Sequence, residues 1–435
     1  MSEWREYRLG DILSIKSGFS YKGKYIGTGD SLLLGMGCVS FKDKFLMSGA
    51  RPYSGPYDDR YKVHSGDIVL ATRQQSDNLP ILAMPAMVPE SLEGKDIVIG
   101  TNLYKVEITD YTFSNVFIYW LLKTKQYVNY IAGVKTGTTV SMVTKKNVED
   151  FTFLAPTNPK EREEIVSIIS SLDDKIAVNR RICENLEAQA QALFKHWFID
   201  FAPFKNGNFC ANREQNETCF NSAEVQPKIT GKACKFVESE LGMIPEGWRV
   251  GRLGDVADIT MGQSPAGSSY NEKGEGIFFY QGRTEFGFRY PSVRLYTTEP
   301  KRFAEPLSTL LSVRAPVGDI NVATDKCCIG RGLASIKSNN NCHSYIFYLL
   351  QSMKRRFDVY NGEGTVFGSI NKDTLNGLKI IIPSNSILLG FEEIVEEMDK
   401  KILGCHQENL RLSTLRDTLL PKLMSGQIKV NEINI

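Results

Sequence analysis

Residues 4–18 read WREYRLGDILSIKSG, and residues 248–262 read WRVGRLGDVADITMG. The two stretches are identical at eight of fifteen positions, including the opening Trp-Arg pair and the Leu-Gly-Asp triplet. An internal repeat of this kind predicts a repeated structural unit. We therefore predict that the chain contains two copies of one unit.

Further matches follow these stretches in the same order. Residues 118–122 (IYWLL) recur as residues 346–350 (IFYLL), and Pro156 recurs as Pro383. The offset between the copies drifts from 244 residues at the first match to 227 at the prolines. The two units therefore share one plan but differ in length between the matches.

Each unit begins with short strand-like runs and one aromatic-rich helical segment. The runs lie at residues 67–72, 97–107, 309–313 and 378–382. The helical segments lie near residues 114–132 and 343–358. Short apolar runs separated by Gly-rich turns are typical of strands, so each unit predicts a compact mixed α/β domain.

A long helix is expected after the α/β part of each unit. Residues 158–161 (NPKE) supply an N-cap asparagine, a proline for the first helical position and an acid in the first turn. Apolar residues then recur at alternating spacings of four and three, which is the heptad pattern of a coiled coil. The seam positions are Ile165, Ile169, Leu172, Ile176, Asn179, Cys183, Leu186, Ala190, Leu193 and Trp197, then Phe391, Val395, Met398, Ile402, Cys405, Asn409, Leu412, Arg416 and Leu419. We expect Pro421 to end the second helix.

Two long helices with matching seams predict that the helices pair with each other. Asn179 and Asn409 occupy seam positions, where a buried amide lowers stability but fixes the register. The predicted fold class is α/β, with two similar mixed α/β domains in a pseudo-twofold arrangement. A long antiparallel two-helix coiled coil separates these domains.

The expected boundaries follow from the helix starts and from a polar, aperiodic stretch at residues 205–240. Each α/β domain is expected to build its own core. The predicted parts are a first domain (1–157), a central helix (158–201), a linker (202–246), a second domain (247–385), a C-terminal helix (386–425) and a tail (426–435).

Composition restricts the possible functions. The 52 Lys and Arg nearly balance the 50 Asp and Glu, so any DNA-binding face must be local. The chain lacks the phosphate-loop, HExxH, GxSxG and kinase signatures, so we expect no catalysis by this chain. Its nine scattered cysteines form no CxxC pair, which favours reduced thiols over a metal site. No signal-peptide core or membrane-length apolar run is present, so we expect a cytoplasmic protein.

Two similar domains at the ends of a rigid helix pair suit a long polymer with local twofold symmetry, so duplex DNA is the natural candidate ligand, and both domains carry local basic and aromatic side chains. Residues 248–383 hold 17 Lys and Arg against 12 Asp and Glu. Arg and Gln pair bidentately with guanine and adenine edges, whereas Lys on loops mostly contacts phosphate. For any single one of these residues, a solvated surface charge is the alternative interpretation.

The sequence resembles the specificity subunits of type I restriction-modification enzymes over essentially its whole length. The resemblance rests on both Trp-x-x-x-x-Leu-Gly-Asp openings, SELGMIPEGW at 239–248, LFKHWFIDF at 193–201, GQSP at 262–265 and RAPVGD at 314–319. It implies two target recognition domains that each read half of a split DNA sequence, and helices that set the spacing and dock two modification subunits. It also implies a restriction/translocase subunit, with S-adenosylmethionine, ATP and Mg in the partner subunits, no cofactor in this chain and no membrane.

The candidate DNA contacts lie in the loop after each opening strand, in the arginine-bearing loops and in the Gly-Thr turns. In the first unit they are Ser20, Tyr21, Lys22, Arg73, Gln74 and Thr138. In the second unit they are Gln263, Ser264, Ser268, Tyr270, Asn271, Gln281, Arg283, Arg314 and Thr365. Gly137 and Gly364 of the Gly-Thr turns equally suit a backbone role, because glycine adopts positive φ.

Two other classes of function remain open from sequence. A self-contained DNA methyltransferase would bind S-adenosylmethionine by itself, and a coiled-coil adaptor without DNA binding would not retard duplex DNA. In the first unit, residues 71–75 (ATRQQ) stand where the second has residues 312–318 (SVRAPVG). Contacts therefore cannot be transferred from one unit to the other.

Overall fold

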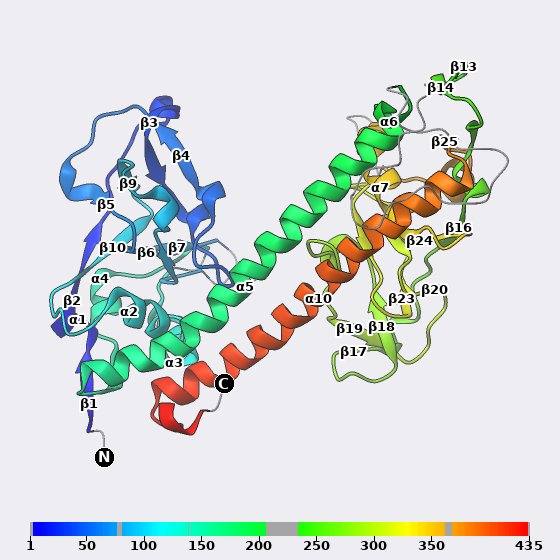
Figure 1. The fold of residues 1–435 in the computed structure, drawn as a ribbon. Coiled ribbons are helices and arrows are strands. Elements are labelled where there is room, and N and C mark those ends of the chain that lie inside the picture. The colour runs from blue at the N-terminus through cyan, green and yellow to red at the C-terminus, as the bar shows by residue number, and fades with distance from the viewer. Residues whose placement is uncertain (1–2, 76–80, 138, 206–233, 362–367, 434–435) are drawn as a thin grey trace. The chain divides into compact units, whose positions relative to one another are not determined.

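The chain divides into two units in the computed structural model (Figure 1). Unit 1 comprises Met1–Asn179 and Gln407–Ile435, and unit 2 comprises Arg180–His406. Each unit therefore contains one α/β domain and one part of each long helix. The structure describes residues 3–75, 81–137, 139–205, 234–361 and 368–433.

The α/β domain of unit 1 contains two four-stranded sheets. One has the order β2-β10-β6-β8 and is antiparallel, and the other has the order β4-β3-β9-β5 with β3 and β9 parallel. The strands are β1 (Trp4–Arg8), β2 (Leu13–Ser17), β3 (Ile26–Leu34), β4 (Ala50–Tyr53), β5 (Lys62–Val63), β6 (Ile68–Ala71), β7 (Arg73–Gln74), β8 (Pro85–Met87), β9 (Ile97–Ile99), β10 (Leu103–Ile108), β11 (Ser141–Met142) and β12 (Thr152–Pro156). The short helices are α1 (Leu9–Ile12), α2 (Asn115–Leu121), α3 (Lys125–Val134) and α4 (Lys145–Glu149).

The α/β domain of unit 2 has a four-stranded sheet of order β16-β24-β21-β22 and a five-stranded sheet of order β17-β19-β18-β23-β20. The strands are β13 (Phe236–Ser239), β14 (Gly242–Pro245), β15 (Arg249–Arg252), β16 (Ala257–Met261), β17 (Tyr270–Asn271), β18 (Ile277–Tyr280), β19 (Leu295–Thr297), β20 (Phe303–Ala304), β21 (Thr309–Ser312), β22 (Ile320–Val322), β23 (Cys327–Ile329), β24 (Leu333–Ser338) and β25 (Lys379–Ile382). The short helices are α6 (Ala202–Lys205), α7 (His343–Ser352), α8 (Lys354–Asp358) and α9 (Lys372–Asn376).

The two domains repeat one topology. The parallel pair β3–β9 corresponds to β18–β23, and the antiparallel pair β1–β12 corresponds to β15–β25. The glycine that ends the repeated sequence is required for the same structural reason in both domains. A Cβ on Gly18 would lie 2.2 Å from the Gly100 oxygen, and one on Gly262 would lie 2.1 Å from the Gly330 oxygen. Only glycine permits this close backbone approach, and the predicted repeat of one mixed α/β unit is confirmed.

The aromatic-rich segment forms two helices in each domain rather than the single predicted helix. In unit 1, α2 and α3 are separated at Thr124, whose hydroxyl accepts a hydrogen bond from the Tyr127 N–H. In unit 2, α7 and α8 are separated at Met353. A threonine that satisfies a free N–H of a new first turn favours a helix start, which explains the break at Thr124.

The two long helices are α5 (Pro159–Phe194), which continues into a π-helical turn (Lys195–Ile199), and α10 (Asn385–Met424) (Figure 1). Asn158 Oδ1 accepts the Lys160 N–H at 3.0 Å, as expected for an N-cap asparagine. Among the described residues, neither these helices nor the shorter ones are long and apolar enough to cross a membrane.

Pro421 lies inside α10, so the prediction that it ends the helix is wrong. Proline lacks an N–H donor and its ring crowds the preceding turn, which normally weakens a helix. The neighbouring residues Leu419, Leu420, Leu423 and Met424 are buried in the core of unit 1. We infer that packing of the last turn outweighs the missing hydrogen bond.

The long helices run antiparallel within unit 1. Asp173 of α5 contacts Arg416 of α10, and the later residue Asn179 contacts the earlier residue Asn409. Asn179 is 1% exposed, and its Nδ2 donates to Asn409 Oδ1 at 3.0 Å and to Glu408 Oε2 at 2.7 Å. The two seam asparagines thus meet in the helix pair, where a slip of register would leave their amides unpaired.

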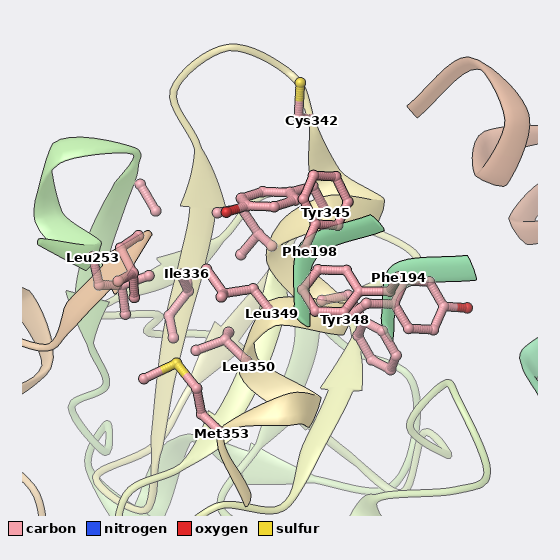
Figure 2. Packing of buried hydrophobic residues seen from close by; sticks show 14 of the residues in the cluster. Phe194, Phe198, Leu253, Ile336, Cys342, Tyr345, Tyr348, Leu349, Leu350 and Met353 are labelled. Atoms are coloured by element: carbon pink, nitrogen blue, oxygen red, sulfur yellow. The ribbon is translucent and has the colours of Figure 1, made fainter. Parts of the chain in front are cut away.

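The helices also contribute to the core of unit 2. Phe194 of α5 and Phe198 of the following turn pack against Tyr345 and Tyr348 of α7 (Figure 2). The Phe198 and Tyr345 rings meet edge to face with centroids 5.1 Å apart, and Phe391 of α10 contacts Phe198 at 5.0 Å. The domain and both helix segments of unit 2 therefore share one core.

Regular structure extends into both described ends of the stretch predicted as a linker. At its start, α6 brings Phe204 against Trp248 with ring centroids 5.1 Å apart. At its end, β13 and β14 form a hairpin that pairs Phe236 with Pro245.

Candidate nucleic-acid interface

The loop after each opening strand meets the end of a parallel strand pair. In unit 1, the Phe19 N–H donates to the Ile99 carbonyl at the end of β9, at 3.1 Å. In unit 2, the Gln263 N–H donates to the Ile329 carbonyl at the end of β23, at 2.9 Å. Both loops predicted to face DNA therefore lie at the carboxyl ends of parallel strands, which is a common place for ligand binding in open sheets.

In unit 1, the candidate Tyr21 lies at the edge of an aromatic cluster. Its ring centroid is 6.1 Å from that of Phe19 and 6.4 Å from that of Tyr53, both in edge-to-face geometry. The neighbouring candidates Ser20 and Lys22 are exposed. The cluster thus fixes Tyr21 and leaves a hydroxyl and an ammonium group beside it open to solvent.

Two cation–aromatic pairs extend this surface and were not predicted. Lys24 Nζ lies 4.8 Å from the Tyr25 ring centroid, and the Arg60 guanidinium carbon lies 4.8 Å from the Tyr61 centroid. The sequence signal for the second pair was the dense run of tyrosines between residues 53 and 61. Lysine, arginine and tyrosine side chains commonly contact DNA phosphates, so this surface suits positioning on a duplex.

The neighbouring candidates Arg73 and Gln74 differ in exposure. Both belong to β7, which pairs with β11. Arg73 is exposed, whereas Gln74 is buried and its Oε1 accepts the Leu82 N–H at 3.1 Å. Gln74 therefore holds the nearby backbone, and Arg73 is the residue of the two that faces solvent.

Gly137, the described residue of the Gly-Thr turn of unit 1, follows a residue that bonds to the strand partner of Arg73. Met142 pairs with Arg73 across β7 and β11, and it also exchanges backbone hydrogen bonds with Thr136. Gly137 has φ +93°, and a Cβ there would lie 2.2 Å from the Val140 carbonyl oxygen, so this turn requires glycine. Thr138, Gly364 and Thr365 lie outside the described residues.

In unit 2, three consecutive residues bring the candidates Gln263, Ser264 and Gln281 together. The Ile329 carbonyl accepts the Gln263 N–H, and the Gly330 N–H donates to the carbonyl of Tyr280, which precedes Gln281. The Arg331 N–H donates to Ser264 Oγ at 3.3 Å. Gln263 and Gln281 are exposed, as is Ser268 in the next turn. These amides form a solvent-facing polar edge, and glutamine amides can pair with adenine.

The candidates Tyr270 and Asn271 make contacts within the domain. The Tyr270 ring packs 4.8 Å from the Phe279 centroid. Asn271 Oδ1 accepts the N–H groups of Lys273 and Glu275 at 3.1 and 3.0 Å. Asn271 therefore fixes a tight turn, as asparagine commonly does.

Arg283 belongs to a cluster of two cations that share one carboxylate. Its guanidinium forms an ion pair with Asp319, and Lys354 Nζ lies 2.7 Å from the other oxygen of the same carboxylate. Burial acts to raise the pKa of Asp319, but the hydrogen bonds from Lys354 and Arg283 outweigh it and lower this pKa. Arg283 remains half exposed and Arg314 is exposed. The cluster carries a net positive charge.

A buried ion cluster ties the domain of unit 2 to both long helices. Arg289 is 3% exposed; its Nη1 lies 2.7 Å from Glu187 Oε2 of α5, and its Nη2 lies 2.8 Å from Asp399 Oδ1 of α10. The guanidinium carbon also lies 3.5 Å from the Phe347 ring centroid. Burial acts to lower the pKa of Arg289, but the charges of Asp399 and Glu187 raise it above its ordinary value. Arg289 is therefore a charged link between domain and helices.

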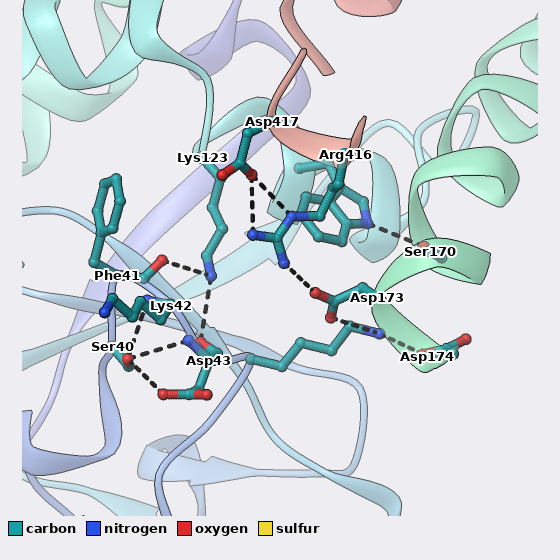
Figure 3. Close-up of polar contacts among 12 residues, drawn as sticks. Ser40, Phe41, Lys42, Asp43, Lys123, Ser170, Asp173, Asp174, Arg416 and Asp417 are labelled. Carbon is teal, nitrogen blue, oxygen red and sulfur yellow. Dashed lines mark hydrogen bonds and ion pairs between the residues drawn. The ribbon is translucent and has the colours of Figure 1, made fainter. Parts of the chain in front are cut away.

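Unit 1 uses a different cluster at its own domain–helix junction (Figure 3). Arg416 of α10 pairs with Asp173 of α5 at 2.5 Å. Lys44, from a loop of the domain, reaches Asp174 at 2.7 Å and Asp173 at 3.6 Å. Trp120 at the end of α2 adds a hydrogen bond of 3.0 Å to a serine of α5.

Lys123 belongs to the same junction (Figure 3). Its Nζ donates to the carbonyl oxygens of Phe41 and Asp43, each at 3.3 Å. Burial lowers the pKa of Lys123 to about 8, although the charges of Asp173 and Asp43 oppose this shift. Lys123 is therefore a cation in an unfavourable environment, held by neutral acceptors.

These anchoring acids were not predicted, although the sequence contains a signal for them. Asp173, Glu187 and Asp399 each follow directly after a predicted seam residue. Charged residues that flank a heptad seam commonly form ion pairs across it. The three acids use this position to bind cations at the two junctions.

Comparison with known proteins identifies the class of this chain. Residues 1–188 and 245–415 match the family described as "Type I restriction modification DNA specificity domain", and the chain belongs to this family. Specificity subunits are the non-catalytic DNA recognition subunits of type I restriction-modification systems, and this chain is one of them.

Individual relatives support this assignment. The chain is 30% identical over 378 residues to the "Putative type I restriction enzyme MjaX specificity subunit" of Methanocaldococcus jannaschii, covering 85% of this chain and 80% of that protein. It is 27% identical to the type I restriction enzyme HindI specificity subunit of Haemophilus influenzae, over 98% of this chain and all of that protein. A solved structure of a type I restriction-modification S subunit from M. genitalium, at 15% identity, has the same fold with a TM-score of 0.59, covering 97% of this chain and 96% of that one. The predicted family is confirmed.

Proposed function

We propose that this chain reads a bipartite duplex DNA target, with each α/β domain reading one part. The observation that carries the proposal is the repeated placement of candidate loops at the ends of β3–β9 and β18–β23. Two copies of one reading surface on one chain suit a target with two recognised parts and unread bases between them. A pseudo-twofold arrangement of the domains would match the local twofold symmetry of duplex DNA.

The partners in this proposal are two modification subunits that dock on the long helices and a restriction/translocase subunit that joins them. S-adenosylmethionine, ATP and Mg belong to those partners. The net charge of +2 offers this chain little energy from counterion release, so we expect weak DNA binding by the chain alone. Titration of duplex DNA with and without a modification subunit tests this, and equally tight specific binding in both cases would contradict it.

Among the candidates, Arg283 is the proposed base reader with the clearest test. An arginine that pairs bidentately with guanine contributes about 1–3 kcal/mol of discrimination. Arg283→Ala should therefore lose selectivity at one base pair. Uniform weakening on all sequences would instead mark Arg283 as a phosphate contact.

The experiment that tests the whole proposal is co-expression with a modification subunit and genome-wide mapping of methylated bases. The wild-type chain should give one bipartite motif. Replacing residues 1–155 with the equivalent domain of a relative should change one part of that motif and leave the other intact. If both parts change, the model of two independent readers is wrong.

We further propose that the helices set the number of unread bases. Inserting seven residues into each helix, near Asn179 and Asn409, keeps the heptad phase and adds ~10.5 Å. The same two half-sites should then be methylated with a gap longer by roughly two to three base pairs. An unchanged gap with retained activity would exclude this role, and insertion of four residues is the out-of-phase control.

A further inference from the structure

One loop of unit 2 joins the candidate base reader Arg283 to the buried Arg289. Arg283 lies in the 3-10 turn η9 (Arg283–Glu285) and its side chain is 51% exposed. Six residues later, Arg289 is buried and bonds to both long helices. The proposed base reader and an anchor on the helices are therefore parts of the same short segment.

Strand β22 and the residue before it hold this segment at three successive points. At the start, Asp319 pairs with Arg283. In the middle, the Asn321 amide donates to the Gly287 carbonyl and accepts the Gly287 N–H, both at 3.1 Å. At the end, the last residue of β22 donates its N–H to the Arg289 carbonyl at 2.9 Å. The segment from Arg283 to Arg289 is thus supported along its length.

The loop is also closed on itself. Glu285 is 3% exposed, accepts a bond of 3.0 Å from the Arg294 guanidinium, and its carbonyl accepts the Ser292 N–H at 2.8 Å. These bonds span the base of the loop on both sides of Arg289. Because the loop is not flexible, a displacement of Arg289 would also displace η9.

The residue after Arg289 contacts the same helix. Tyr290 is 5% exposed, its hydroxyl donates to the Asp399 carbonyl at 3.5 Å, and its ring centroid lies 5.0 Å from that of His406. Two consecutive loop residues thus contact α10, and Arg289 contacts α5 as well. The loop is seated on the helix pair by charge and by packing.

We propose that Arg289 is a positioning residue for DNA reading, which seats the loop on the helices and thereby sets where Arg283 meets the second half-site. This inference rests on the proposed function. It assigns Glu187 and Asp399, which lie on the helices, to the specificity machinery of the second domain. The helices would then support the reading of bases in addition to separating the readers.

The test uses the full chain in complex with its modification subunit. In the main variant, Arg289→Met is combined with Glu187→Gln and Asp399→Asn, so that no uncompensated charge is buried. Methylation rates are measured on duplexes that carry each single base substitution in either half-site. We expect at least a tenfold loss of discrimination at the base pair that Arg283→Ala also affects, with unchanged discrimination in the first half-site. Arg289→Lys keeps the charge but loses the planar guanidinium that bridges Glu187 and Asp399, and it should give an intermediate loss.

A matched control is the unit 1 pair Arg416→Met with Asp173→Asn, which should leave discrimination in the second half-site unchanged. A uniform fall in rate with unaltered discrimination in both Arg289 variants would overturn the proposal, because it would make Arg289 merely structural. So would a loss at base pairs that Arg283→Ala does not affect. Failure of the proposed function itself would look different, since the wild-type complex would then methylate no bipartite site.

Discussion

The two units fasten similar domains to the same two helices with ion clusters of different composition. In unit 2 the domain supplies the cation, Arg289, and the helices supply the acids Glu187 and Asp399. In unit 1 the domain supplies Lys44 to Asp173 and Asp174 of α5, and Asp173 also pairs with Arg416 of α10. The repetition of a fold therefore does not require repetition of the junction that holds it.

The two domain cations lie at nearly matching positions of the repeat, whereas one helix position differs in charge. Lys44 and Arg289 are 245 residues apart, close to the offset of 244 at the repeated opening sequence. Glu187 and Arg416 are 229 residues apart, which is also the offset between the EEIV sequences at 163–166 and 392–395. A helix position that is acidic in one copy is thus basic in the other. Each junction suits its own domain.

The clusters also differ in burial. The side chains of Arg289 and Glu187 are 3% and 9% exposed, whereas those of Lys44 and Asp174 are 34% and 67% exposed. Breaking a buried ion pair leaves an uncompensated charge in a poorly solvated place, whereas an exposed pair is easily replaced by water. The same kind of substitution should therefore have very different effects in the two units.

The largest effect is expected for Arg289→Met. Loss of the cation leaves Glu187 and Asp399 buried without their partner, so unit 2 should lose about 3–5 kcal/mol of stability. Urea denaturation, with hydrogen exchange to locate the change, measures this. Hydrogen-exchange protection in unit 1 should stay unchanged. A loss of stability below about 1 kcal/mol would mean that water solvates the two acids in the variant.

Arg416→Met should have a smaller effect, in unit 1. Arg416 and Asp173 are 14% and 12% exposed, so their bond is only partly shielded, and we expect a loss of about 1–2 kcal/mol. A double-mutant cycle with Asp173→Asn isolates the pair. A coupling energy near zero would show that the pair contributes nothing beyond packing.

The stability of unit 1 should depend on pH in a way that reflects the titration of Lys123. Its pKa in the folded chain, about 8, lies below the ordinary value of 10.5, so the unfolded chain binds more protons between these values. The free energy of unfolding should therefore rise with pH from about 8 to 10.5. Lys123→Met should reduce this rise, measured as the difference between the two stability profiles. Identical slopes would contradict the role of burial.

Lys44→Met should have the smallest effect. Its ion pairs with Asp173 and Asp174 are partly exposed, so we expect a loss of about 0.5 kcal/mol or less in unit 1. The loss should shrink further in 1 M salt, because ions screen exposed pairs. A salt-insensitive loss above 1 kcal/mol would indicate that Lys44 acts through packing.

Features with a local cause could be predicted from the sequence. The repeat, the helix seams and the N-cap at Asn158 follow from periodicity and from single residues. The end of α10 could not be predicted from such local signals, because burial of the last turn outweighs the local effect of Pro421. Local signals thus fix elements but not their limits.

The candidate site could be predicted only in outline. The loops were predicted, but the side chains of Gln74 and Asn271 bind backbone N–H groups, which composition does not reveal. Arg289 looked like a surface charge, yet the residue that pairs with it, Glu187, lies 102 positions away in sequence. Pairings of such long range depend on the packed fold, and a single sequence carries little information on them.

The paired terminal strands of each domain have a consequence for how such chains diversify. Trp4 lies opposite Pro156 in β1–β12, and Arg249 lies opposite Ile382 in β15–β25, so each domain begins and ends at one place. Length changes between the paired strands need not shift the helix that follows, which is where the drift in offset from 244 to 227 occurs. Genetic crossovers at these two strands would exchange everything between them as one cassette and leave the heptad phase intact.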